Sequence, residues 1–253
     1  PSGASGGGGA APALPATEVA SVAATCDPAA PASAEFAPLA RLTRREYARS
    51  VKDLLGFDFP VTNLQPDGIV GLFFANVSTP VSEAQVDQYR IAAEQIAEAA
   101  TQDVAALTGC APETGEACAR SFIDAFGRRA FRRPLQAEET DAYLAIFRTG
   151  SARDAFRGGI RLVLTGMLQS PRFLYRVEQS PRVAVGPAKL NGFELAARLS
   201  YLVTASTPDP LLLDAAASGT LDTDQGLQDQ ATRLLVSPAG AAALGAFHGE
   251  WLK

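Results

Sequence analysis

The sequence predicts an all-α protein: a multi-helix bundle in two subdomains, with a long irregular connector and a disordered N-terminal linker. Apolar residues recur at helical spacing in one block after another. These blocks begin at capping motifs and end at glycine or proline. Nowhere do apolar and polar residues alternate over several positions, as they would in a half-buried strand.

Residues 1–37 form the predicted linker. They are dominated by Gly, Ala, Pro and Ser, which cannot bury enough apolar surface to offset the entropy of ordering the chain. Because the chain starts at Pro1 without a methionine, we expect a processed, exported protein. We interpret the linker as a tether, for example to a lipid anchor upstream. A tail without a role fits the same residues.

Residues 38–180 form the first predicted helical domain, which contains two modules at about 38–108 and 114–178. Between its first two helices lies a connector with too many apolar side chains for a solvated loop, so we expect it to pack across the helices. The expected helices cover 43–56, 82–107, 114–131, 137–148 and 151–169, and the connector covers 57–81.

Local capping motifs support these helices. Thr43 with Glu46 forms a capping box at the start of the first helix, and Gly56 provides its C-terminal stop. Ser151 with Asp154 begins the last helix of the domain. That helix is so rich in apolar residues that we expect it at the centre of the core.

A Pro/Gly-rich break at 180–187 is the best internal boundary, and residues 188–253 form the second predicted helical domain. Asn191 with Glu194 caps its first helix. The sequence stops inside an amphipathic segment, so we expect the domain to continue beyond Lys253, in the same polypeptide or in a cleaved partner chain. Further helical segments are expected at 208–217, 223–236 and 238–251.

Composition limits the classes of protein. With 253 residues, 47% of them hydrophobic, the chain can bury one or two cores. A net charge of −5 does not provide the basic surface of a nucleic-acid-binding protein. No stretch approaches the roughly 20 apolar residues that a membrane-spanning helix needs.

The three cysteines indicate the cellular compartment through the bonds that they can form. Cys110 and Cys118 flank a short Pro/Gly loop, and we expect them to form a disulfide, with two free thiols as the alternative. Cys26, in the linker, would then stay free or pair outside the chain. A disulfide favours an oxidising compartment, so we expect a periplasmic, outer-membrane or cell-surface location.

Metal, haem and nucleophile motifs are weak. Haem attachment through Cys-x-x-Cys-His has no match, and one histidine with scattered cysteines does not suit zinc. Met167 and His248 are formally a His/Met axial pair for haem. We interpret Met167 as a core residue, because it lies in the apolar helix, and His248 as a surface or interface residue. The sequence assigns no catalytic residue.

The strongest polar signal is a cluster of four arginines at the end of the third expected helix. Four guanidiniums could bind a carboxylate or phosphate ligand, including haem propionates. We favour a structural role, because cations complement the C-terminal end of a helix and acidic partners follow at Glu138, Glu139 and Asp141. The arginines are Arg128, Arg129, Arg132 and Arg133.

Five phrases in a fixed order carry a family resemblance: RLTRREYARSVKDLLGFD, CARSFIDAFGRRAFRRPLQAEETDAYLAIF, FRGGIRLVLTGMLQSPRFLYRVE, LNGFELAARLSYLVTASTPDPLLLDAAASGTL and ATRLLVSPAGAAALGAFHGEWL. Together they resemble secreted, cytochrome-associated multidomain proteins of planctomycetes and myxobacteria, over about residues 39–253. Relatives tend to carry an F-x-N-N-A phrase where this chain reads Phe74-Ala75-Asn76-Val77-Ser78. If that loop binds a ligand, its chemistry in this chain departs from that of the relatives.

The resemblance implies electron-transfer or redox work at the cell envelope, with haem c in the C-terminal continuation and none bound by this chain alone. The leading hypothesis is the N-terminal helical scaffold of an exported cytochrome-like protein. A cell-surface interaction or adhesion module without redox activity is the alternative. An extracellular polymer hydrolase ranks last, with Asp67, Glu83 and Asp87 as formal candidates for a carboxylate pair.

Overall fold

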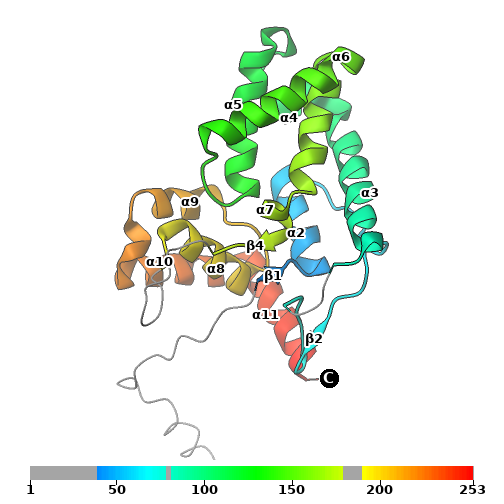
Figure 1. Cartoon of the computed structure of the whole chain (residues 1–253). Helices are drawn as coiled ribbons and strands as arrows, with labels where there is room; N and C mark the ends of the chain where they lie inside the picture. Colours follow the sequence, from blue (N-terminus) through cyan, green and yellow to red (C-terminus); the bar gives the residue numbers. More distant parts are fainter. Residues whose placement is uncertain (1–38, 78–80, 179–189, 253) are drawn as a thin grey trace, which may run out of the picture.

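The computed structural model describes residues 39–77, 81–178 and 190–252. The predicted linker over 1–37, Cys26 and the predicted boundary at 180–187 lie outside the described residues. Helices dominate the described chain, and the prediction of an all-α fold is confirmed (Figure 1). The helices and strands are β1 (Ala40–Arg41), α2 (Arg44–Leu55), β2 (Ile69–Val70), β3 (Phe73–Phe74), α3 (Glu83–Ala100), η1 (Thr101–Asp103), α4 (Val104–Thr108), η2 (Pro112–Thr114), α5 (Glu116–Ala130), α6 (Ala137–Leu168), α7 (Pro171–Leu174), β4 (Tyr175–Arg176), α8 (Gly192–Thr204), α9 (Pro210–Ala217), η3 (Thr220–Asp222), α10 (Asp224–Leu235) and α11 (Pro238–Trp251).

Helix α2 shows how local sequence sets the boundaries of the helices. The Thr43 side chain accepts a hydrogen bond from the backbone N–H of Glu46, and the Glu46 carboxylate accepts one from the N–H of Thr43. This capping box pairs donors that a helix N-terminus would otherwise leave free. Gly56 ends the helix with φ of 83°, a left-handed conformation that glycine adopts without strain. Both predicted caps are confirmed.

A first core forms where α2, α3, α5, α6 and α7 meet. Figure 1 shows α3, α5 and α6 rising as a bundle above α2 and α7. Met167 is fully buried there, as expected for a core residue. The other large, fully buried side chains of this core are Leu42, Tyr47, Ile96, Ile123, Leu144, Ile160, Leu164, Leu168 and Phe173.

Helix α6 is two helices joined at a kink. Asp154 and Ala155 have non-helical backbone angles, and Ala155 has φ of 45°. Glycines permit the close contact between the two arms, because a Cβ on Gly150 would lie 2.4 Å from the carbonyl oxygen of Gly158. The sequence predicts two helices here, but it places the second start at Ser151, three residues before the kink.

The connector between α2 and α3 packs against the helices, as its apolar content predicts. Phe57, Phe59 and Val61 pack against the first core, and Leu64 is buried in it. The antiparallel hairpin of β2 and β3 was not predicted, because two-residue strands are too short to show alternation. Asn76 is buried and donates to the carbonyl of Leu42, so this residue holds the connector in place.

A second, smaller core forms among α8, α9, η3 and α10. Its buried side chains include Ala196, Leu212, Leu221 and Leu234. Asn191 caps α8 through a capping box with Glu194, as predicted. In Figure 1 these helices lie to one side of the first core, and α11 runs from them toward the β2–β3 hairpin.

The predicted disulfide is present. Cys110 and Cys118 are bonded, with their Cα atoms 5.9 Å apart. The helix that follows the loop begins at Glu116 rather than at the expected Thr114, because Gly115 has φ of 59° and breaks the helical backbone between η2 and α5. Over the described residues, none of the helices combines the length and the apolar character that crossing a membrane requires.

Candidate functional site

Arg132 is a buried guanidinium that is surrounded by neutral oxygen atoms. Its side chain is 4% exposed, and its backbone has φ of 62°, because it lies in the sharp turn after α5. The guanidinium donates to the carbonyl oxygens of Arg172, Phe173 (3.2 Å) and Tyr175 (2.7 Å). These bonds fix the turn after α5 to α7 and β4. A buried charge of this kind needs such partners to offset its desolvation.

Tyr201 completes this site from α8. Its phenol oxygen accepts from Nη1 of Arg132 at 3.0 Å and shares a second hydrogen bond with Oγ of Ser50, also at 3.0 Å. Because Arg132 donates to the phenol oxygen, the O–H of Tyr201 is available to donate to Ser50. The guanidinium carbons of Arg132 and Arg176 each lie 5.6 Å from the centre of the Tyr201 ring. We call these residues, with Phe173, the Tyr201 cluster.

The other predicted arginines do not join this cluster. Arg128 pairs with Asp214 on α9 at 2.7 Å, Arg129 donates to the carbonyl of Asp53, and Arg133 pairs with Glu139 at 2.8 Å. The structure thus gives four neighbouring arginines four separate sets of protein partners. The ion pair with Glu139 follows the structural role that we favour from sequence, and binding of a ligand by these arginines stays a prediction.

Glu139 lies between two guanidiniums. Its carboxylate pairs with Arg133 at 2.8 Å and with Arg172 at 2.6 Å, and its side chain is only 12% exposed. Hydrogen bonds from Arg133, aided by the N–H of Gln136 and the charge of Arg172, lower the pKa of Glu139 to about 2. The carboxylate therefore stays ionised and paired over the usual range of pH.

The loop between α8 and α9 is buried against α2 and α5. Arg49 donates to the carbonyl of Thr204 at 2.8 Å, Ser206 donates to the carboxylate of Asp53 at 2.5 Å, and Thr207 donates to the carbonyl of Arg129 at 2.7 Å. Ser206 is 1% exposed and Thr207 5%. Polar side chains thus fix the end of α8 and the loop that follows it to the first core.

An exposed apolar surface lies where α11 meets the β2–β3 hairpin. The rings of Phe73 and Phe247 stack with their centres 5.1 Å apart, and Trp251 follows one turn later on α11. Figure 1 shows the hairpin beside the last turns of α11. We define the apolar face as Ile69, Val70, Leu72, Phe73, Phe74, Leu244, Phe247, Trp251 and Leu252.

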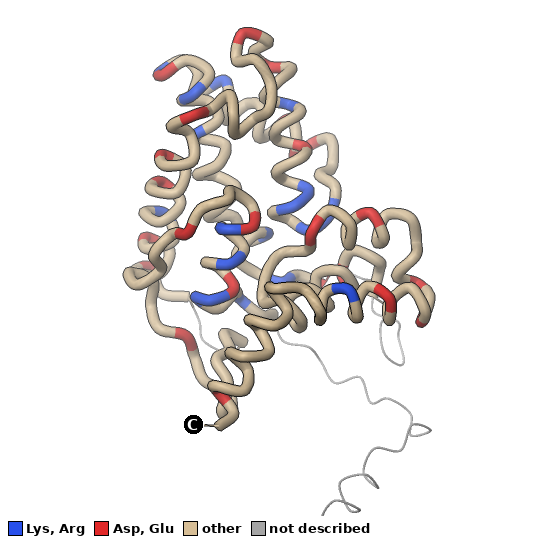
Figure 2. Tube along the Cα trace, turned by 180° about the vertical axis from the view of Figure 1, so that it is seen from behind, with Lys and Arg blue, Asp and Glu red and all other residues tan. Residues whose placement is uncertain are grey.

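Glu250 holds the two parts of the apolar face together. It is 6% exposed, pairs with Arg45 of α2, and accepts from the backbone N–H of Phe74 at 3.2 Å. Its charge is therefore neutralised within the chain. Figure 2 shows few charged positions along α11, in contrast to the acidic row on α3. His248 is exposed next to Phe247 and Trp251, and its Nδ1 lies 2.9 Å from the carbonyl of Leu244.

The carboxylates considered for a hydrolase have separate surroundings. Asp67 accepts from the backbone N–H of Arg44 and from the side chain of Asn76, and Asp87 pairs with Arg90. Glu83 is exposed in the first turn of α3. In the part of the chain that the structure describes, no group of three or more His, Cys, Asp or Glu side chains is placed to hold a metal ion.

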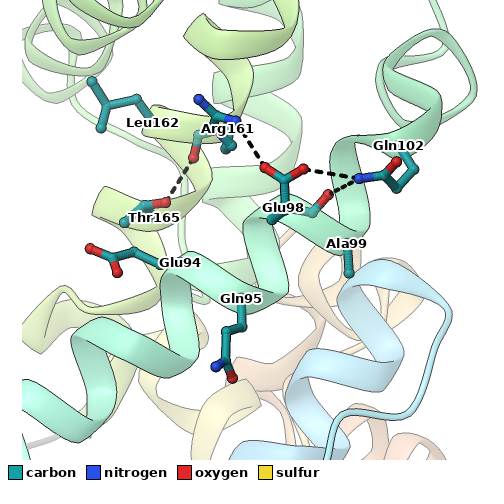
Figure 3. Close-up of a pocket in the computed structure, with 8 residues that line it drawn as sticks. All are labelled: Glu94, Gln95, Glu98, Ala99, Gln102, Arg161, Leu162 and Thr165. Atoms are coloured by element: carbon teal, nitrogen blue, oxygen red, sulfur yellow. Dashed lines mark hydrogen bonds and ion pairs between the residues drawn. The ribbon is translucent and has the colours of Figure 1, made fainter.

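A groove of about 580 Å³ lies between α3 and α6, and none of these three carboxylates lines it (Figure 3). Glu98, one of its charged residues, pairs with Arg161 at 2.8 Å and with Arg157, and also accepts from Gln102. The hydrogen bonds from Arg161 and Arg157 lower the pKa of Glu98, and the three partners together use both of its oxygens. The groove is lined by Glu94, Gln95, Glu98, Ala99, Gln102, Arg161, Leu162 and Thr165.

Three family models match the chain in succession. Residues 40–102 match PSD3, residues 118–178 match PSD5 and residues 190–253 match PSD4, which are described as proteins of unknown function (DUF1587, DUF1595 and DUF1592). The chain thus contains three such domains, consistent with a multidomain protein of the planctomycete type. No curated protein and no solved structure matches it significantly.

The Tyr201 cluster takes residues from all three matched domains. Ser50 belongs to the first, Arg132, Phe173 and Arg176 to the second, and Tyr201 to the third. Sequence analysis singled out Arg132 but missed Tyr201 and Ser50, since neither belongs to a motif. A tyrosine one turn before the end of a capped, amphipathic helix is the only local signal of the contact.

Proposed function

We propose that the three domains form the rigid scaffold of an exported, cytochrome-like assembly and hold a redox module in place. The Tyr201 cluster carries this proposal. A scaffold must keep its parts at fixed positions, and here buried hydrogen bonds connect the domains at one point. Because each buried donor would lose its partner if a domain moved away, separation carries a cost in free energy.

Export and redox work rest on two further supports. The Cys110–Cys118 disulfide fits an oxidising compartment. The five phrases in sequence resemble cytochrome-associated proteins, and the three matched domains follow the same order along the chain. The proposed location is the periplasm, the outer membrane or the cell surface.

The residues of this chain do not fit a haem of their own. No Cys-x-x-Cys-His is present for covalent attachment. Met167 is fully buried in the first core while His248 is exposed on α11, so the pair does not suit axial ligation of one haem. The four arginines have protein partners. We therefore assign haem c to the module that the scaffold carries, in the C-terminal remainder or in a partner chain.

An absorption spectrum of the native assembly that contains this chain tests the proposal. The assembly is purified from its source organism, and spectra are taken after air oxidation and after reduction with dithionite. A Soret band with sharp α and β bands in the reduced state is the expected result. A featureless visible spectrum of the intact assembly would overturn the redox proposal.

The apolar face favours a second candidate function, a cell-surface interaction module without redox activity. Such a module would bind its partner through the face that α11 and the hairpin form. The absorption spectrum distinguishes the two candidates. The redox scaffold predicts a Soret band, whereas the interaction module binds its partner in an assembly that contains no haem. An assembly with one stable partner and no Soret band would support this second candidate.

A further inference from the structure

Arg41 carries a buried positive charge that the described part of the chain leaves largely unpaired. The residue is 4% exposed, and its Nη1 donates to the side-chain oxygen of Gln85 at 3.1 Å. Its Nε–H is buried and has no hydrogen-bond partner among the described residues, and no carboxylate among them forms an ion pair with it. A buried charge without a counter-ion is costly, so this guanidinium requires a further partner.

Arg132 shows how the same fold satisfies a guanidinium that is buried to the same extent. It is also 4% exposed, but it donates to carbonyl oxygens of α7 and β4 and to the phenol of Tyr201. Arg41 has a single amide oxygen instead, and Gln85 shares that oxygen with the backbone N–H of Ser82. The described surroundings of Arg41 therefore lack the acceptors that the chain provides elsewhere.

The unpaired donors of Arg41 lie on the edge of the guanidinium that Nε and Nη2 form. Its one side-chain hydrogen bond leaves from Nη1, on the other side of the group. Two exposed arginines of this chain bind carboxylates by that same edge. Arg198 donates to Glu178 from Nε at 3.0 Å and from Nη2 at 2.8 Å. Arg148 donates to Glu116 from the same two atoms. The edge thus matches the two oxygens of a carboxylate.

Further hydrogen-bond donors lie near Arg41. Its guanidinium carbon is 6.0 Å from the centre of the Tyr89 ring. Strand β1 pairs Arg41 directly with Tyr175 of β4, so the two side chains lie on the same side of the strands. Arg44 brings a second guanidinium, whose buried Nε–H also has no partner among the described residues. Burial raises the pKa of Tyr89, whereas the positive charges of Arg41 and Arg44 lower it, so both guanidiniums are close enough to act on this phenol.

The charges near the Tyr89 phenol leave a positive excess. Asp67 is the carboxylate that acts on this phenol, and it raises the pKa of Tyr89. Its oxygens accept from the backbone N–H of Arg44 and from the side chain of Asn76. Arg41 and Arg44 against Asp67 leave one positive charge. A carboxylate carries the single negative charge that balances it, whereas a phosphate group carries nearly two.

We propose that Arg41 binds the carboxylate of a small monoanionic ligand through its Nε and Nη2 atoms, at the place where β1, α2 and α3 meet. Arg44 supplies the second positive charge, and the phenols of Tyr89 and Tyr175 provide further donors. Since Arg41 is almost fully buried, a small molecule reaches this edge more readily than a protein surface does. The site does not depend on the scaffold role or on a redox module.

Nuclear magnetic resonance of the arginine Nε–H groups in the full 253-residue chain tests this inference. Sodium acetate is the probe, and sodium chloride at equal ionic strength is the reference. We expect the Nε–H signal of Arg41 to shift and to saturate with acetate in the millimolar range, and the signal of Arg44 to follow with the same dissociation constant. The signals of Arg148 and Arg198 are internal controls and should not move, because carboxylates of the chain already bind their edges.

Three results would overturn the inference. An Arg41 signal that does not saturate with acetate would show that water is a sufficient partner for its Nε–H. Equal shifts with chloride would show a site for any anion. Binding of inorganic phosphate as tight as that of acetate would contradict the charge balance, since we expect phosphate to bind about tenfold more weakly.

Two variants test the roles of the guanidiniums. Arg44→Gln changes a partly buried residue, so the chain should stay folded while its affinity for acetate falls about fivefold. Arg153→Gln is the matched control: it removes the same charge at an exposed position on α6 and should leave acetate binding unchanged. Equal affinities in the two variants would contradict the role of Arg44. Arg41→Lys keeps the charge but loses the two-donor edge, so the Arg44 signal should no longer saturate. If Arg41→Lys does not fold, the titration of the parent chain decides.

Discussion

The phenol oxygen of Tyr201 lies 3.0 Å from Nη1 of Arg132, although the two residues are 69 positions apart in the chain. The same oxygen shares a hydrogen bond with Ser50, which is 151 positions away. This atom therefore connects three regions of sequence that match three separate family models. Neither partner of Tyr201 is a carboxylate, so the contact depends on geometry more than on paired charge.

Removing the phenol oxygen should destabilise the protein. Tyr201→Phe keeps the ring near Arg132 and Arg176 but leaves Arg132 and Ser50 each without one hydrogen-bond partner. Unsatisfied buried groups cost about 1–3 kcal/mol, so the free energy of unfolding should fall by that amount. Urea denaturation followed by circular dichroism measures it.

Tyr47→Phe is the matched control for that substitution. Tyr47 is fully buried between Tyr89 and Phe173, its hydroxyl has no hydrogen-bond partner, and burial raises its pKa. Removing this hydroxyl should leave the free energy of unfolding unchanged or raise it by about 1 kcal/mol. Equal losses in the two variants would contradict the role assigned to Tyr201.

Glu139 should contribute to stability in a way that depends on pH. Its pKa falls from an ordinary 4.5 to about 2 in the folded chain. The contribution is fully present above pH 4.5 and is lost as the pH falls toward 2, because the folded state then binds the proton that the unfolded state already holds. At neutral pH we expect about 1–3 kcal/mol, given the partial exposure of the pair.

The measurement for Glu139 is the free energy of unfolding between pH 6 and pH 2. Glu139→Gln should be less stable than the parent at pH 6, and the two curves should converge toward pH 2. Glu138→Gln, one position earlier and exposed, serves as the control. Parallel curves for Glu139→Gln and the parent would contradict the ion pairs with Arg133 and Arg172.

Reduction of the disulfide should lower stability to a moderate extent. Cys110 and Cys118 close a loop with a sequence separation of 8. Loop-closure entropy predicts a loss of about 2–3 kcal/mol in the variant with serine at both positions. Thermal unfolding with and without reductant measures it, and reductant should have no effect on the serine variant. A parent that unfolds at the same temperature in both conditions would refute the bridge.

Two glycine substitutions should have opposite effects. Gly150→Ala places a Cβ 2.4 Å from the carbonyl oxygen of Gly158, so the contact between the arms of α6 must open at a cost of about 1–3 kcal/mol. Gly245→Ala meets open space within α11 and should add about 0.5–1 kcal/mol through helix propensity. Equal thermal shifts in the two variants would argue against the kink.

Much of the helical layout can be predicted from sequence because its signals are local. The capping boxes at Thr43 and Asn191 and the stop at Gly56 act within four residues, and the structure has all three. The kink of α6 is harder to place, since Gly150 and Gly158 act through a contact in space. The sequence shows a break in the pattern but not the residue at which the backbone turns.

The Tyr201 cluster cannot be predicted from local sequence signals. Its hydrogen bonds join residues far apart in the chain, and no propensity or motif connects Ser50 with Tyr201. The arginines illustrate the same limit: they appear as one cluster in sequence but diverge to separate partners once α5 is packed. Residues that are neighbours in sequence need not share partners, because the final partner of a side chain depends on which elements meet in the fold.

A rigid scaffold requires the three domains to unfold as one body, and differential scanning calorimetry tests this directly. For the isolated chain we predict a single transition with equal calorimetric and van't Hoff enthalpies. Tyr201→Phe should shift that transition to lower temperature without splitting it. Two or three separate transitions in the parent chain would show that the domains unfold independently, and would contradict a scaffold held together at Tyr201.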